Sequence, residues 1–168
     1  MKVLATPLSL FLLLCFAIGS EALPAISARQ ENDVGITVPQ LIVEIGTDTF
    51  VDNTVTAELT IQNPSDVEIT IDHITASAGL DGVIYASIDQ SFSSFVIPAA
   101  SSASSGAIPN IPLVQGLSAS LSIVGLNLDI INANVTLRSG TTSGSGGVAD
   151  TISNYAQAGV TTEWTFIS

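Results

Sequence analysis

The chain has 168 residues, of which 46% are hydrophobic and 11% are charged, and its formal net charge at pH 7 is −12. This apolar content is high enough for a packed core, which excludes an acidic disordered chain. The excess of 15 acidic over 3 basic residues repels phosphate backbones and anionic lipids. We therefore expect no nucleic-acid partner and no docking on an anionic membrane.

The first residues are typical of a secretory signal. Lys2 precedes an apolar run from Leu8 to Ile18, which is too short to span a bilayer, and small residues follow it. We predict cleavage after Ala22, with Gly19 as the alternative, and a secreted, extracellular mature chain without a transmembrane segment. The only cysteine, Cys15, leaves with the signal, so the mature chain has no disulfide and no thiolate metal ligand.

Three parts are expected along the chain. Residues 1–22 are the signal peptide, residues 23–35 a flexible N-terminal arm, and residues 36–168 a single β-domain. A domain of that length can form a sufficient core without disulfides.

The clearest strand pattern lies between Thr54 and Ala78. Apolar and polar residues alternate from Thr54 to Gln62, which indicates a half-buried strand. Asn63 and Pro64 then predict a tight corner, because proline cannot donate to a ladder and asparagine favours turns. In the following strand the apolar positions change parity at Asp72, so we predict a β-bulge at residues 72–73 that keeps one face buried.

The remaining elements follow from weaker patterns. Further strands are expected at 36–45, 82–88, 94–97, 111–124, 126–137 and 160–166, with a turn at 46–53. Pro39 indicates that the first strand lies at an edge or begins after the proline. Gly125 indicates a bulge or a tight bend. The Ser/Gly-rich residues 99–107 and 139–147 are expected to be flexible loops, and 150–157 at most one helical turn. About 7–9 short strands predict an all-β, antiparallel β-sandwich.

The strand ending in Asn63-Pro64, the strand after it, and Ile111-Pro112-Leu113-Val114-Gln115-Gly116 resemble the LEA-2 family of water-stress proteins. The resemblance covers about residues 38–125 and is strongest to fungal secreted or membrane-tethered members. It implies an immunoglobulin- or fibronectin-III-like sandwich and no catalytic residues. Only Asn63 and Pro64 carry over, as corner residues. The chain departs from the family pattern in having a full signal peptide and no membrane anchor.

Catalytic and metal-binding patterns were weighed in turn. A nucleophilic triad needs a base, and His73 is the only histidine. Asp66, Glu68 and Asp72 could form a carboxylate pair for glycoside hydrolysis, but a solvated strand face is the preferred explanation. The oxygen ligands of residues 48, 52 and 53 suggest calcium, yet they lack the spacing of an EF-hand. We predict no catalytic, cofactor-binding or metal-binding residues.

One modification site is expected. Asn134-Val135-Thr136 is an N-glycosylation sequon, whereas Asn63-Pro64-Ser65 is excluded by its proline. We predict glycosylation at Asn134 if that part of the strand is exposed.

Two functions follow from this sequence. The first is a secreted, non-enzymatic β-sandwich with a structural, interaction or stress-protective role. The alternative is a binding module for an apolar ligand or cell-wall polymer, because isoleucine, valine and leucine are abundant enough to line a cavity between sheets. A carboxylate-based hydrolase ranks lowest.

Overall fold

The computed structural model describes residues 35–167, so the predicted signal peptide and almost all of the predicted arm lie outside the described residues. Eight strands and two short helices make up the fold, in agreement with the expected all-β class and strand number. The elements are β1 (Thr37–Ile45), α1 (Thr47–Asp52), β2 (Thr54–Asn63), β3 (Ile69–Leu80), β4 (Val83–Ile97), β5 (Ser101–Ser104), β6 (Ile108–Pro112), α2 (Leu117–Leu121), β7 (Leu128–Ser139) and β8 (Val148–Phe166).

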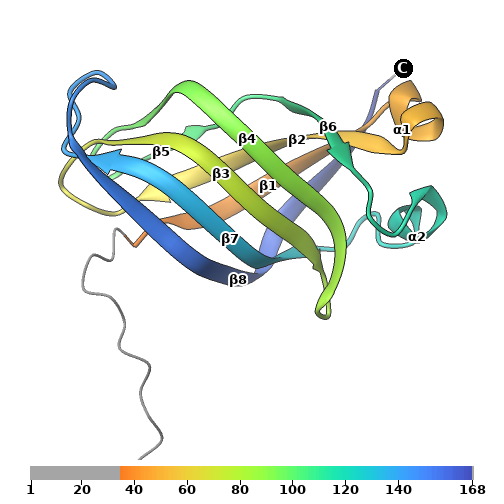
Figure 1. Ribbon diagram of the computed structural model, residues 1–168. Coiled ribbons are helices and arrows are strands. Elements are labelled where there is room, and N and C mark those ends of the chain that lie inside the picture. Colours follow the sequence, from red (N-terminus) through yellow and green to blue (C-terminus); the bar gives the residue numbers. More distant parts are fainter. Residues whose placement is uncertain (1–34, 168) are drawn as a thin grey trace, which may run out of the picture. The chain divides into compact units, whose positions relative to one another are not determined.

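The strands form one curled sheet in the order β4-β3-β7-β8-β1-β2-β5, and β6 also pairs with β2 (Figure 1). The long strand β8 joins its two halves. Its first part, to Val160, pairs with β7 in antiparallel fashion, and its last part, from Thr161, pairs with β1 in parallel. The expectation of a purely antiparallel arrangement is therefore wrong at this pair.

The two edges of the sheet approach each other at one end. Ala86 of β4 forms a β-bridge with Leu113, just beyond β6, and the Val114 N–H donates to the Tyr85 carbonyl at 2.8 Å. Helices α1 and α2 lie at this same end (Figure 1). Among residues 35–167 there is no helix with the length and apolar character needed to cross a membrane.

The inward faces of both halves form one apolar core. Val55, Ala57, Leu59 and Ile61 are all buried, which confirms the alternation predicted for β2. Many other core residues are β-branched, and their stiff side chains pack well on a pleated sheet.

The predicted bulge is confirmed in β3. Its register against both β4 and β7 shifts between Ile71 and His73. Ile71 before the shift and Ile74 after it are both buried, at 0% and 3% exposure. The extra residue thus keeps the apolar side chains on one face although their parity changes in the sequence.

Pro39 lies in a central strand rather than at an edge. The continuous pairing of β1 with both β2 and β8 begins only at Gln40, the residue after the proline. This fits the other expectation, that regular strand pairing starts after Pro39. Before the proline, the Gln157 side chain acts in place of a neighbouring strand. It accepts from the Val38 N–H at 2.9 Å and donates to the Val38 carbonyl at 2.8 Å.

Several predicted elements are wrong. Residues 111–124 are not one strand but the end of β6, a turn and helix α2, because the segment pairs with a strand only as far as Val114. Residues 46–53 contain α1, and 99–107 contain β5. The two strands expected at 82–88 and 94–97 are one strand, β4. Residues 150–157 belong to β8, which pairs with β7 there.

The predicted corner at Asn63 and Pro64 joins β2 to β3. Asn63 is fully buried, and its Nδ2 donates to the carbonyls of Val67, Ile97 and Pro98 at 2.8–3.3 Å. Its Oδ1 accepts from the backbone N–H and hydroxyl of Ser65 at 3.0 and 2.6 Å. One side chain thus ties the ends of β2 and β4 to the start of β3.

We expect Asn63→Ala to lower the free energy of unfolding by about 3 kcal/mol, because it leaves several buried backbone groups without partners. Urea unfolding would measure the loss. Gln62→Ala, at the exposed neighbouring position, is the control and should cost less than about 0.5 kcal/mol. Equal losses in the two variants would contradict this role of Asn63.

Candidate functional site

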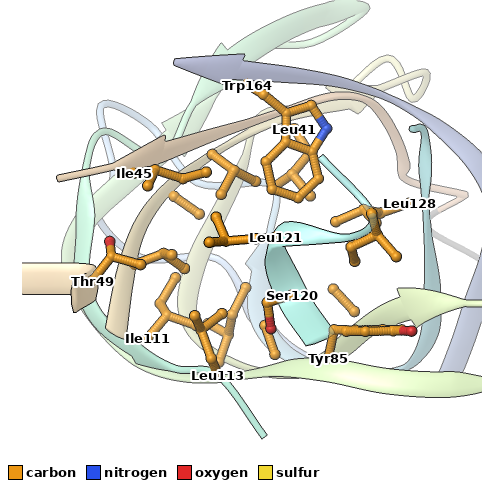
Figure 2. A pocket seen from close by; sticks show the side chains of 17 residues that line it. Leu41, Ile45, Thr49, Tyr85, Ile111, Leu113, Ser120, Leu121, Leu128 and Trp164 are labelled. Atoms are coloured by element: carbon orange, nitrogen blue, oxygen red, sulfur yellow. The ribbon is translucent and has the colours of Figure 1, made fainter. Parts of the chain in front are cut away.

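An apolar cavity of about 40 Å³ lies inside the curled sheet at the end that carries the helices. Every strand except β5 contributes to its lining, together with both helices. Figure 2 shows Leu121 of α2 in the middle of the lining, with Trp164 and Leu41 on one side and Ile111 and Leu113 on the other.

The polar side-chain atoms of Thr49, Ser120 and Trp164 in the lining already have backbone partners. Thr49 Oγ1 accepts from the Gly46 N–H at 3.1 Å, and Ser120 Oγ donates to the Gly116 carbonyl at 2.9 Å. The Trp164 indole N–H donates to the Leu126 carbonyl at 3.0 Å. The cavity therefore offers its contents mainly carbon surface, which favours apolar molecules.

A second cavity of about 30 Å³ lies farther along the core. Ala133 and Tyr155 line it, and it shares Leu41 and Ala78 with the first cavity. Burial raises the pKa of the Tyr155 phenol, whose hydroxyl donates to Gln157 Oε1. No helix covers this cavity, and its lining consists of strand residues and Ile36.

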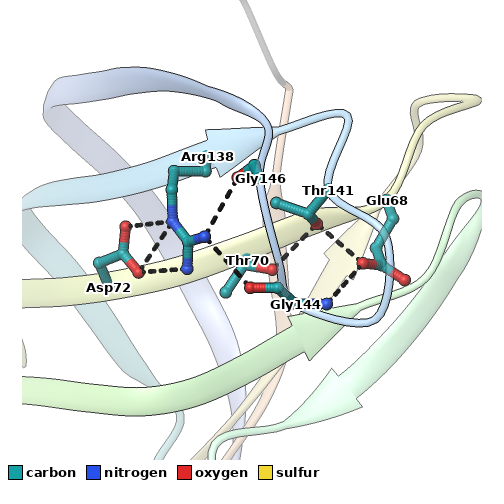
Figure 3. A network of polar contacts seen from close by, with 7 residues as sticks. All are labelled: Glu68, Thr70, Asp72, Arg138, Thr141, Gly144 and Gly146. Carbon is teal, nitrogen blue, oxygen red and sulfur yellow. Dashed lines mark hydrogen bonds and ion pairs between the residues drawn. The ribbon is translucent and has the colours of Figure 1, made fainter.

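Polar side chains gather instead at the end of the sheet away from the helices, around the loop between β7 and β8. Arg138 makes a bidentate contact with Asp72, at 2.8 Å from Nη2 and 2.9 Å from Nε (Figure 3). Its Nη1 donates to the carbonyls of Gly144 and Gly146, both at 3.1 Å. Arg138 thus fastens the loop to the bulged part of β3.

Glu68 fastens the same loop from the other side. Its Oε1 accepts from the Thr141 hydroxyl at 2.8 Å and from the Gly144 N–H at 3.0 Å. Thr141 is also hydrogen-bonded to Thr70 at 2.9 Å (Figure 3). The loop 139–147, expected to be flexible from its composition, is therefore held to β3 by side chains from several directions.

These contacts shift the pKa values of both carboxyl groups. Hydrogen bonds from Gly144 and Thr141 lower the pKa of Glu68, and the hydrogen bond from Arg138 lowers that of Asp72. The same hydrogen bond with Asp72 raises the pKa of Arg138. Both carboxylates are thus stabilised in their charged form by the contacts that order the loop.

The structure separates the three carboxylates considered for hydrolysis. Asp66 is exposed at the corner, Glu68 contacts the β7–β8 loop, and Asp72 is paired with Arg138 of β7. His73 Nε2 lies 2.8 Å from Asp89 Oδ1 on the neighbouring strand β4, and the Asp89 side chain is 81% exposed. This is a solvent-exposed pair on the outer face.

The calcium alternative concerned Asp48 and Asp52 of α1 and the residue after it, Asn53. The Asn53 side chain donates to the Leu113 carbonyl at 2.9 Å and so fastens β2 to the segment beyond β6. Within residues 35–167, no three or more His, Cys, Asp or Glu side chains are grouped so that they could hold a metal ion.

Asn134 lies in the middle of β7 with its side chain exposed. Its Oδ1 accepts from the Asn154 N–H of β8 at 3.1 Å. The exposure meets the condition set for the sequon, and glycosylation itself stays a prediction.

The sequence did not point to the helix residues that line the cavity. In residues 117–123, leucine, alanine and isoleucine alternate with serine, which is a strand pattern. Leu117 and Leu121 are also four residues apart, as in a helix, and glycines stand at 116 and 125. Those two glycines could have indicated that the segment between them is not part of the neighbouring strands.

No known protein family matches this sequence, and a comparison with well-characterised proteins also finds no match. The LEA-2 resemblance therefore remains a prediction.

We expect acid to destabilise the fold through Glu68 and Asp72. Because their pKa values are lower in the folded protein, the unfolded chain binds protons more readily. Their contribution is complete above the ordinary values of 4.5 and 3.8 and is lost as the pH falls through the lowered values. Urea midpoints between pH 7 and pH 2 would show the decline.

In the variant Arg138→Gln this decline should become shallower, since Asp72 loses the partner that lowers its pKa. Asp66→Asn removes an exposed carboxylate outside the cluster and is the control. A decline unchanged in Arg138→Gln, or equally reduced in Asp66→Asn, would refute the assignment to this cluster.

The sequon predicts a glycan on Asn134 when the chain is made in a eukaryotic secretory system. Mass spectrometry of the secreted protein should show a glycosidase-sensitive increase that disappears in Asn134→Gln. It should also disappear in Thr136→Ala, which keeps the asparagine but destroys the sequon. Unmodified Asn134 in the secreted protein would contradict the prediction.

Proposed function

We propose that this chain is a secreted, non-enzymatic β-domain that acts by binding an apolar molecule in the cavity beneath α2. The fold that we propose for it is a variant of the immunoglobulin- or fibronectin-III-like sandwich, in which the curled sheet supplies both layers. The apolar cavity carries this proposal, because a concave, carbon-lined space is the usual form of a small-molecule site.

The position of the cavity supports a functional role. It lies where the sheet edges approach through Ala86 and Leu113, and two helices rather than further strands cover that end. At about 24 cal/mol per Å³, an empty cavity of this size costs about 1 kcal/mol of stability. A bound apolar ligand would recover that cost.

The size of the cavity limits how binding can occur. Apolar cavities that hold benzene measure about 150 Å³, several times the volume present here. A ligand of useful size therefore requires part of the lining to move. Tyr85, Leu121 and Trp164 are only half-buried and form the accessible part of that lining.

A ligand-free structural or stress-protective role is the second candidate. The closely held β7–β8 loop and the fully hydrogen-bonded Asn63 favour it, because they make the end of the sheet opposite the helices rigid. This candidate requires no ligand, so a binding experiment separates the two.

We expect apolar ligands to raise the melting temperature of the protein, by 2 °C or more for a panel member that fits, since a ligand that binds only the folded state stabilises it. The variant Ala57→Val, which reduces the first cavity, should lose this shift. Ala133→Val is the matched control, because Ala133 is equally buried but lines only the second cavity.

Differential scanning fluorimetry with alcohols, sterols and terpenes, and with soluble glycans as representatives of cell-wall polymers, would make the measurement. A panel without any shift would leave the ligand-free role standing. Shifts that survive in Ala57→Val but not in Ala133→Val would assign binding to the other cavity.

A further inference from the structure

The segment that carries α2 is joined to the rest of the fold at its two ends. On the N-terminal side, the Leu113 N–H donates to the Asn53 carbonyl at 3.0 Å, and Gln115 Nε2 donates to the Ile84 carbonyl at 3.0 Å. On the C-terminal side, the Trp164 indole holds the Leu126 carbonyl. These contacts fix residues 113–115 and 126.

Between these points, the backbone N–H groups of residues 116–125 donate to no strand. Ser120 donates to Gly116, and the N–H groups of 122, 123 and 124 donate to residues 119, 120 and 121. Two bonds join the segment to the residues that flank it, from the Gly116 N–H to the Leu113 carbonyl and from the Leu126 N–H to the Ile123 carbonyl. Gly116 and Gly125 bound the segment and have φ angles of 79° and 89°, which favour glycine. Moving the segment as a unit therefore breaks no backbone hydrogen bond to a strand.

Side chains hold the segment in place. Ile123 is 5% exposed, and Leu121 and Ser120 reach the cavity lining. Figure 2 shows Leu121 projecting among the strand residues of the lining. If the segment moved outward, Leu121 and Ile123 would leave the core, and the space they fill would join the cavity. An apolar ligand could then replace the contacts that these two side chains lose.

The charge around the cavity restricts the ligand. None of the residues that line it is charged. Arg138, the only Lys or Arg side chain of residues 35–167, lies ten residues along β7, about 30 Å away, and is bound to Asp72. A ligand carboxylate in the cavity would meet carbon surface and no cation, so its charge would stay uncompensated.

We propose that residues 116–125 form a flap over the cavity, with Leu121 as its plug, and that the flap admits electrically neutral molecules with an alkyl chain rather than fatty-acid anions. This inference rests on the proposed function and names its ligand class. The chain length that fits is set by the volume that Leu121 and Ile123 vacate.

Isothermal titration at pH 7 with 1-dodecanol and dodecanoate, both below micelle formation, tests the ligand class. The two probes share their alkyl chain and differ in the charged end. The alcohol should bind at least tenfold more tightly than the carboxylate. No binding of either probe, together with no shift across the wider panel, would overturn the proposed function and this inference with it. Equal binding of both would overturn only the preference for neutral ligands.

Two leucines of α2 test the flap. Leu121→Ala removes the plug and should tighten dodecanol binding about fivefold, because the binding-competent state becomes more populated. Leu117→Ala truncates a leucine of the same helix that does not line the cavity and should leave binding unchanged. If Leu121→Ala does not fold, Leu121→Val makes a smaller truncation with the same expected direction. Equal affinities in the wild type and both variants would refute the plug.

Hydrogen exchange gives an independent measurement on the unaltered protein. The amides of residues 117–124 should exchange faster than those of β7 and should slow at least threefold when dodecanol is added. Flap amides as slow as those of β7 in the free protein would refute a movable flap. Slowing spread evenly over all strands, rather than concentrated in the flap, would refute binding beneath it.

Discussion

Strand β8 is the constraint on which the rest of this structure depends. Its first part belongs to the half of the sheet formed by β7, β3 and β4, and its last part to the half formed by β1 and β2. Because a single strand belongs to both halves, the sheet must curl for the two apolar faces to meet. Val160, where the pairing changes, is 1% exposed, so the core also passes through this point.

The curl leaves two unlike ends, and polar chemistry is distributed unequally between them. Around the β7–β8 loop, Arg138 and Glu68 form hydrogen bonds with the loop backbone and with neighbouring side chains. At the other end, short helices cover an apolar cavity and contribute few contacts of that kind. The rigid end keeps the strands in register, which lets the opposite end carry a segment that can move without loosening the sheet.

Much of the sheet could be predicted from the sequence, because strand patterns depend on local burial. The alternation in β2 and the bulge at residues 72–73 both follow from which side chains must face the core. The course of residues 117–124 could not be predicted, since its alternating residues fit a strand, whereas in the structure no strand pairs with it and residues 117–121 form a helix. The composition of 139–147 hid its order for a related reason: the groups that hold the loop, Glu68 and Arg138, lie outside it. The cavity could not be predicted either, because its lining comes from nearly every element and depends on how all of them are placed.

The parallel pairing of β1 with the end of β8 also has a mechanical consequence. The six residue pairs from Gln40–Thr161 to Ile45–Phe166 run side by side in the same direction. A force that pulls residues 35 and 167 apart therefore loads this ladder along the strands, and its hydrogen bonds share the load instead of opening one after another. Resistance to forced unfolding is governed by the unfolding rate rather than by equilibrium stability. Tension applied between residues 35 and 167 would therefore meet its resistance in the β1–β8 ladder.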